Sequence, residues 1–115
     1  MKRGEIRVVD FEPIRGSESD KRRPAVIVSN DGANTTAQRL GRGVITVVPV
    51  TSNVTNVYPF QVLLTPAASG LRIESKAQAE QFRSVAVERV GRRVGQLSAE
   101  TIEALDEALR LHLAL

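Results

Sequence analysis

The sequence predicts a small, mainly β domain of the α+β class: a curled sheet or barrel of short strands with a C-terminal helix packed on it. Short apolar runs are separated by clusters of turn-forming residues, which is typical of several short strands. The clearest helical pattern follows residue 97. The chain has 115 residues, enough for one hydrophobic core and too few for two ordinary domains, so we expect a single domain over residues 1–115.

The first third of the chain predicts two strands joined by a long loop. Residues 5–11 alternate apolar and polar side chains over most of their length, as a half-buried strand does. Residues 12–22 are polar and show no period, so we expect a long exposed loop. Residues 24–28 form a continuous apolar run suited to a central strand, and the turn formers of residues 30–34 predict a turn after it.

Four further segments complete the predicted sheet. Residues 44–50 are the most strand-like stretch, and Pro49 inside it predicts an edge strand or a bulge, because proline has no N–H to donate. Residues 60–64 predict a short strand. Residues 76–84 fit neither period cleanly, and we expect a strand there followed by one helical turn. Residues 94–97 predict a last short strand.

The predicted C-terminal helix has start signals and one apolar face. Ser98 is a good N-cap residue, and Glu100 suits the positive end of the helix dipole. Leu97 and Ile102 can form a hydrophobic staple across this start. Apolar side chains then recur at helical spacing and predict one buried stripe, formed by Ile102, Leu105, Leu109 and Leu113.

Charge is distributed unevenly along the chain. The formal net charge is +3, yet residues 98–115 carry four acidic side chains and one basic side chain. Residues 32–73 contain no Asp or Glu but include Arg39, Arg42 and Arg72. A polyanion would therefore be attracted to the body of the protein and mildly repelled by its C-terminal segment. A well-solvated surface without such a partner is the alternative interpretation of this modest net charge.

Composition also excludes several kinds of site. The chain has no cysteine, which excludes a disulfide framework, a thiol nucleophile and a thiolate metal site. With His112 as the only histidine, a two-histidine ribonuclease is excluded, and we expect neither a metal nor another cofactor. No apolar run approaches the roughly 20 residues of a membrane-spanning helix, and residues 1–5 lack the apolar core of a signal peptide. We therefore expect a soluble cytoplasmic protein with no membrane partner.

Arg23 and Thr51 are the most informative residues for function. Each lies beside a predicted strand: Arg23 precedes residues 24–28, and Thr51 follows residues 44–50. A guanidinium group stays charged and offers five donors in a fixed fork, which suits a phosphate better than a carbonyl group. A cation and a hydroxyl group presented together by two strands therefore indicate phosphodiester chemistry.

Six motifs in a fixed order make the chain similar to a known family. They are Gly4-Glu5-Ile6, Gly16-Ser17-Glu18, Arg23-Pro24-Ala25-Val26-Ile27-Val28-Ser29-Asn30-Asp31, Val48-Pro49-Val50-Thr51-Ser52, Tyr58-Pro59-Phe60 and Glu80-Gln81-Phe82-Arg83-Ser84-Val85. With these motifs at these spacings, the chain resembles the MazF/PemK endoribonuclease toxins of type II toxin–antitoxin systems. The resemblance implies an SH3-like, CcdB-like barrel that works as a homodimer and cuts single-stranded RNA at short sequence motifs without a metal. It also implies a cognate MazE-like antitoxin with an acidic tail.

The resemblance further implies roles for individual residues. As catalytic residues, Arg23 would bind the scissile phosphate, and Thr51 would donate a hydrogen bond to a developing oxyanion or to the attacking oxygen. The neighbouring 2′-hydroxyl would attack phosphorus, which gives 2′,3′-cyclic phosphate and 5′-hydroxyl products. We favour an electrostatic role for Arg23, because a guanidinium group effectively never deprotonates. The general base is unassigned, and Glu18 is the nearby loop carboxylate in the matching motifs.

Candidate RNA-binding residues lie in the long loop and near the ends of predicted strands. They are Ser17, Glu18, Lys21, Asn30, Ser52, Gln81 and Arg83. Gln81 lies where relatives place a base-reading amide, and its side chain offers a donor and an acceptor together, as base edges require. The few aromatic side chains are also core candidates, so we expect recognition by hydrogen bonds and shape.

Two other functions compete with an RNA-cleaving toxin. CcdB-like toxins share the implied fold but bind gyrase and have no nuclease activity. They rely on a Trp-Gly-Ile carboxyl end, whereas this chain has no Trp and ends Leu111-His112-Leu113-Ala114-Leu115. The second alternative is a catalytically inert RNA-binding barrel, and the joint presence of Arg23 and Thr51 argues against it.

Overall fold

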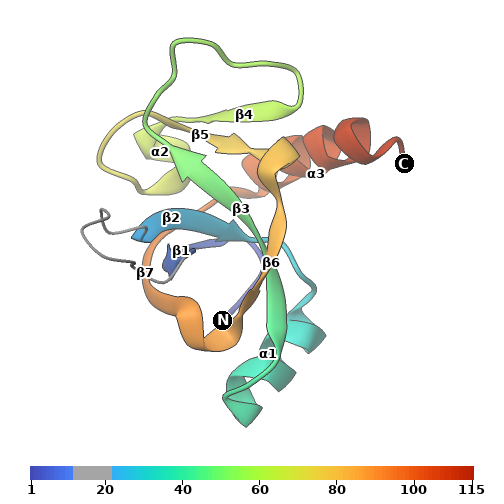
Figure 1. The fold of residues 1–115 in the computed structure, drawn as a ribbon. Helices are drawn as coiled ribbons and strands as arrows, with labels where there is room; N and C mark the ends of the chain where they lie inside the picture. Colours follow the sequence, from blue (N-terminus) through green and yellow to red (C-terminus); the bar gives the residue numbers. More distant parts are fainter. Residues whose placement is uncertain (12–21) are drawn as a thin grey trace, which may run out of the picture.

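The structure is a computed structural model that describes residues 1–11 and 22–115. Its strands pair into one curled antiparallel sheet with helices around it (Figure 1). The strands are β1 (Glu5–Asp10), β2 (Arg22–Ile27), β3 (Val44–Thr51), β4 (Gln61–Leu64), β5 (Ser75–Gln78), β6 (Arg83–Ala86) and β7 (Val90–Gln96). The helices are α1 (Asp31–Leu40), α2 (Pro66–Ser69) and α3 (Ala99–Leu113), with 3₁₀ turns η1 (Ala79–Gln81) and η2 (Val87–Arg89). The predicted α+β class with a C-terminal helix is confirmed.

Strand β3 is the central element of the sheet. Among the described residues, the strand order is β4-β5-β3-β2-β1-β7, and β6 also pairs with β3. One side of β3 pairs with β2, whereas its other side pairs with β6 along residues 44–47 and with β5 at Val50 and Thr51. Pro49 was predicted to mark an edge strand or a bulge, and the edge-strand alternative is wrong. Pro49 lies in a central strand, at the point where the partner changes from β6 to β5.

Both faces of β2 and β3 are buried, which explains their continuous apolar sequences. Successive side chains of a strand point to opposite faces of a sheet. Val26 and Val48 belong to one core, which includes residues of α3, β4 and β5. Ala25 and Val47 belong to a second core, which includes residues of α1 and β6. The central strand predicted from the apolar run before residue 29 is confirmed.

Helix α3 begins as predicted and packs on β4 and η1. The Ser98 side chain caps the helix by accepting a hydrogen bond from the Thr101 backbone N–H. Leu105 and Ala108 are buried, but Leu113, predicted as the last member of the buried stripe, is exposed. The packed face therefore ends about one turn before the helix itself.

Residues 30–34 were predicted to form a turn, but they begin helix α1. Asn30 is the N-cap residue, and its side chain accepts a hydrogen bond at 2.8 Å from a backbone N–H of the first turn. Asn34 is fully buried, and its amide donates to the Ser29 carbonyl oxygen. Ser29 Oγ in turn accepts a hydrogen bond from the Thr46 N–H of β3. Residue types that favour turns thus cap and anchor a helix here.

Two other predicted segments differ from the structure, and a third is not described by it. The segment 76–84 is not one strand, because β5 is followed by η1 and then by β6. The last strand is longer than residues 94–97, since β7 begins at Val90. Most of the predicted loop, residues 12–21, lies outside the described residues. In the described part of the chain, no helix is long and apolar enough to cross a membrane.

Candidate active site

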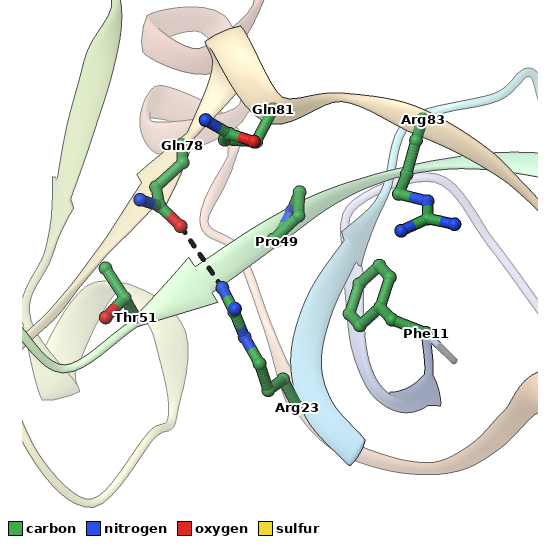
Figure 2. A pocket seen from close by; sticks show the side chains of 7 residues that line it. All are labelled: Phe11, Arg23, Pro49, Thr51, Gln78, Gln81 and Arg83. Atoms are coloured by element: carbon green, nitrogen blue, oxygen red, sulfur yellow. Dashed lines mark hydrogen bonds between the residues drawn. The ribbon is translucent and has the colours of Figure 1, made fainter. Parts of the chain in front are cut away.

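One pocket of about 460 Å³ gathers four of the six described residues that were predicted for catalysis and RNA binding (Figure 2). We call it the arginine pocket; its lining is Phe11, Arg23, Pro49, Thr51, Gln78, Gln81 and Arg83. Phe11 directly follows β1, and the other lining residues come from β2, β3, β5, η1 and β6. The structure therefore brings the predicted catalytic residues Arg23 and Thr51 together with Gln81 and Arg83.

Strand register explains why these distant residues share a pocket. Ala25 on β2 lies opposite Pro49 on β3. Continuing this antiparallel register by two residues places Arg23 opposite Thr51, on the same face of the sheet. Arg83 on β6 pairs with β3 two residues before Pro49, also on this face. This face of the sheet packs on the second core, and beyond its apolar part it carries the side chains of Arg23, Arg83 and Thr51.

Two guanidinium groups contact one aromatic ring in this pocket. The Cζ atoms of Arg83 and Arg23 lie 5.3 Å and 5.9 Å from the centroid of the Phe11 ring, within cation–π range. Phe11 as a whole is only 8% exposed and belongs to the second core, which holds its ring in place. Gln78 Oε1 accepts a hydrogen bond at 3.3 Å from Arg23 Nη2, the dashed line in Figure 2. A buried ring and an amide therefore hold Arg23 in position.

The Thr51 side chain supplies a hydroxyl donor beside these cations. Its Oγ1 accepts a hydrogen bond at 3.2 Å from the Asn53 backbone N–H. A hydroxyl group has one proton to donate besides its acceptor lone pairs. The backbone after β3 thus orients the oxygen and leaves the proton available to a ligand.

The arginine pocket is electropositive in the part of the chain that the structure describes. Its lining includes two arginines and no carboxylate. Among the described residues, no ion pair joins Arg23 or Arg83 to an Asp or Glu side chain. Two cations fixed near a hydroxyl donor can bind an oxyanion and stabilise negative charge that develops on it.

The other predicted RNA-binding residues lie elsewhere. Ser52 lines a neighbouring space of about 1000 Å³, the adjacent hollow, which shares Arg23 and Thr51 with the arginine pocket. Asn30 lines neither space, and its side chain caps α1. The predicted loop residues fall outside the described ranges: Ser17, Glu18 and Lys21.

Phe11 and Gln78 were not predicted as site residues. From sequence, Phe11 was only a core candidate, which it also is. Gln78 belongs to no recognisable motif. Its position follows from the pairing of Val50 with Ala77, which places the next residue of β5 beside Pro49. Gln78 could have been predicted as a site residue if the register between β3 and β5 had been known, but the sequence alone does not reveal that register.

Comparison with known proteins assigns the chain to a family. The sequence profile of the PemK-like, MazF-like toxins of type II toxin–antitoxin systems matches residues 2–113. The chain belongs to this family. The resemblance inferred from its motifs is thereby confirmed.

Two curated relatives of this MazF-like chain are named endoribonucleases. Endoribonuclease MazF9 of Mycobacterium tuberculosis is 64% identical over 115 residues, which cover 100% of this chain and 98% of the relative. Endoribonuclease EndoA of Bacillus subtilis is 29% identical over 116 residues, which cover 100% of this chain and 96% of the relative. The similarity therefore extends over whole chains, not over one motif.

Solved structures of MazF toxins share the fold. MazF from Deinococcus radiodurans superposes with a TM-score of 0.74 at 24% identity, covering 100% of this chain and 97% of that chain. A mycobacterial endoribonuclease in complex with its cognate antitoxin gives a TM-score of 0.77 at 20% identity. The superposition covers 100% of this chain and 96% of that chain. These comparisons do not support the alternative of a CcdB-like, gyrase-binding toxin.

Proposed function

We propose that this MazF-like toxin is a sequence-specific, metal-independent endoribonuclease that cleaves single-stranded RNA. The observation that carries the proposal is the pair of guanidinium groups, Arg23 and Arg83, held against Phe11 in the pocket that contains the Thr51 hydroxyl. The names of the relatives MazF9 and EndoA support the same activity.

The proposed reaction uses the 2′-hydroxyl of the RNA itself. Its oxygen loses its proton to a general base, which is unassigned, and attacks the adjacent phosphorus. The bond to the 5′-oxygen of the next nucleotide breaks, and this oxygen takes up a proton, which gives a 2′,3′-cyclic phosphate and a 5′-hydroxyl. Arg23 and Arg83 stabilise the extra negative charge on the phosphoryl oxygens, and Thr51 donates to a developing oxyanion or to the attacking oxygen. No carboxylate or imidazole lines the described part of the pocket. We therefore assign electrostatic stabilisation, not proton transfer, to these side chains.

Sequence specificity is assigned to polar groups around the two spaces. Gln81 is exposed at the arginine pocket and can donate to and accept from a base edge. Ser52 offers a hydroxyl group in the adjacent hollow. The loop residues predicted from the family motif, Ser17, Glu18 and Lys21, complete the proposed RNA contacts.

The proposed partner is a cognate MazE-like antitoxin whose acidic tail covers the arginine pocket in place of RNA. The acid-free lining of the described pocket supports this choice, because carboxylates pair well with guanidinium groups. MazE–MazF complexes from Deinococcus radiodurans have a toxin of the same fold, with a TM-score of 0.74. We further propose a cytoplasmic homodimer, and sedimentation that finds only monomers at micromolar concentration would contradict it.

The direct test is incubation of the protein with a long unstructured RNA in EDTA. Wild type is compared with Arg23→Ala and with the control Arg42→Ala, because Arg42 is exposed and lines neither space. We expect discrete cuts with wild type and control, and a loss of about 100-fold or more with Arg23→Ala. Absence of cuts by wild type on several RNAs, or full activity of Arg23→Ala, would contradict the proposal.

A further inference from the structure

The segment between β3 and β4, residues 52–60, leads directly out of the candidate active site (Figure 1). We call it the β3–β4 loop. It begins next to Thr51, the last residue of β3, and the Asn53 backbone N–H donates to Thr51 Oγ1 at 3.2 Å. The Asn53 side chain accepts a hydrogen bond at 3.2 Å from the Thr55 N–H. The orientation of the Thr51 hydroxyl group therefore depends on where this loop lies.

Lys76 lies beside Thr51 on the sheet. Strand β5 places Lys76 opposite Thr51 on one side and opposite Leu63 of β4 on the other. Directly paired residues of antiparallel strands point to the same face, so these three side chains share one face of the sheet. Lys76 is only 8% exposed, whereas Leu63 is 42% exposed. A segment outside the sheet must therefore cover Lys76.

The contacts of the Lys76 ammonium group show that the β3–β4 loop is this segment. Lys76 Nζ donates to the Asn56 carbonyl oxygen at 2.6 Å and lies 5.9 Å from the centroid of the Tyr58 ring, within cation–π range. Among residues 1–11 and 22–115, no ion pair involves Lys76. A buried ammonium group is costly unless it has hydrogen-bond partners. Loop arrangements that cover Lys76 but move the Asn56 carbonyl group away are therefore disfavoured.

The end of the β3–β4 loop has a separate attachment. Gln61, the first residue of β4, is buried, and its Oε1 accepts a hydrogen bond at 3.2 Å from the Tyr58 N–H. Gln61 Nε2 donates to Glu80 Oε2 of η1 at 2.7 Å. Thr51 thus holds the start of the loop and Gln61 holds its end. The contact that fixes the middle of the loop on the sheet is the one made by Lys76.

We infer that Lys76 is a positioning residue for the reaction. By holding the β3–β4 loop on β5, it keeps the Asn53 N–H on Thr51 Oγ1 and so directs the Thr51 proton toward the substrate. The inference rests on the proposed function, because that function gives the Thr51 hydroxyl group its role. Lys76 lines neither the arginine pocket nor the adjacent hollow. A residue outside the pocket can still matter, since a misplacement of about 1 Å can cost roughly 100-fold in rate.

The test is single-turnover cleavage of one RNA that has a mapped cut site, at a temperature where circular dichroism shows each protein folded. Lys76→Met keeps the length of the side chain but removes the ammonium group. The matched control is Lys2→Met, since Lys2 is exposed and lines neither space. Both changes are repeated in a Thr51→Val background, which completes a double-mutant cycle. Varying the protein concentration gives the maximal rate and the half-saturating concentration separately.

We expect Lys76→Met to lower the maximal rate by roughly 10- to 100-fold, with the half-saturating concentration unchanged. In the Thr51→Val background the same change should cost less than about twofold, because the hydroxyl group that Lys76 positions is then absent. Lys2→Met should match its parent protein in both backgrounds.

Amide hydrogen exchange measured by NMR tests the loop without RNA. The Asn53 N–H should exchange faster in Lys76→Met than in wild type, because the loop then leaves Thr51 Oγ1 part of the time. The Ala33 N–H, which donates to the Asn30 side chain, is the internal control and should be unchanged. Wild type that cuts no RNA, with Asn53 exchange that still responds to Lys76→Met, would contradict the proposed function and support the loop contact.

Four results would overturn the inference. Folded Lys76→Met could cleave as fast as the control, or its Asn53 exchange could equal that of wild type. The rate could fall equally in both backgrounds, which would show a role independent of Thr51. Only the half-saturating concentration could rise, which would indicate direct contact of Lys76 with RNA.

A second variant applies if Lys76→Met does not fold. Tyr58→Leu removes the ring beside the ammonium group, and Tyr58 is half exposed, so this change is mild. We expect a slower maximal rate that depends on the Thr51 hydroxyl group, together with faster Asn53 exchange. An unchanged rate and unchanged exchange in Tyr58→Leu would overturn the inference.

Discussion

At the scale of single residues, the candidate site depends on how Arg23 is held. One of its N–H groups donates to Gln78 Oε1, and its guanidinium group contacts the buried Phe11 ring. Neither contact neutralises the cation. Because arginine has five N–H donors, the remaining ones are available to a phosphate. The pocket is therefore organised before substrate binds, which is what electrostatic stabilisation of a transition state requires.

The Thr51 hydroxyl is predicted to act through its donor proton. Thr51→Val keeps the branched shape but removes the hydroxyl group, and we expect cleavage to fall by about 100- to 1000-fold. Thr51→Ser keeps the hydroxyl group and should retain most of the activity. Single-turnover cleavage of one RNA by the three proteins measures this difference. Equal losses in the Ser and Val variants would assign Thr51 a packing role.

At the scale of secondary-structure elements, the sequence predicts those parts whose signals are local. Helix α3 has its own cap in Ser98, and the two apolar central strands reflect burial on both faces. Helix α1 was missed although Asn30 caps it, because it has no clear apolar stripe. It buries only Asn34 and Ala37, and Asn34 is anchored by Ser29 rather than by apolar packing. The break of residues 76–84 into β5, η1 and β6 was not predicted, because it depends on β5 and β6 pairing with different parts of β3.

The Glu5–Arg7 pair of β1 predicts acid-sensitive stability. Burial would raise the pKa of Glu5, but the hydrogen bond and charge of Arg7 outweigh it and leave the pKa below the ordinary value of 4.5. A carboxylate with a lowered folded-state pKa stabilises the fold above its unfolded pKa, and this contribution is lost as the pH falls through the folded pKa. We expect Glu5→Gln to be less stable than wild type at pH 7 and to converge with it in acid.

Urea unfolding across this pH range measures the effect. The control is Glu103→Gln, since Glu103 is exposed on α3. A stability difference between wild type and Glu5→Gln that stays constant from neutral to acidic pH would contradict the assigned ion pair.

The Asn30 cap of α1 gives a second prediction at this scale. Asn30→Ala removes the acceptor for the first-turn N–H and should lower the free energy of unfolding by about 1 kcal/mol. Asn30→Asp keeps an acceptor and should retain most of the stability. Thermal unfolding compares the three proteins. A rise in KM for RNA at a temperature where all are folded would instead support the RNA contact predicted from sequence.

At the scale of the whole molecule, the candidate site lies where β3 changes partners and where the second core reaches the surface. Arg23 and Thr51 were expected to lie together from the sequence, but Gln81 and Arg83 were not expected to share a pocket with them. Their meeting depends on the registers of β3 with β2, β5 and β6. Such long-range pairings have no local signal in the sequence. For the same reason, Gln78 was not predicted as a site residue.

The arrangement of charge predicts how RNA binding responds to salt. The two spaces together present four arginines: Arg23, Arg72, Arg83 and Arg92. Contacts with three or four phosphates should give a log–log slope of roughly −2 to −3 for a single strand, at about 0.7 per contact. Anisotropy of a 2′-O-methyl RNA at several salt concentrations measures this slope. Affinity that does not change with salt would show that these cations do not contact phosphates.

The central claim is that the arginine pocket promotes attack by the 2′-hydroxyl of the RNA. Its most direct test is analysis of product ends, in EDTA, for an all-ribose RNA and for the same RNA with one 2′-deoxy nucleotide just before the cut. We expect 2′,3′-cyclic phosphate and 5′-hydroxyl ends from the first RNA and no cut in the second. Cleavage at the 2′-deoxy position, or products with 3′-hydroxyl and 5′-phosphate ends, would contradict the claim.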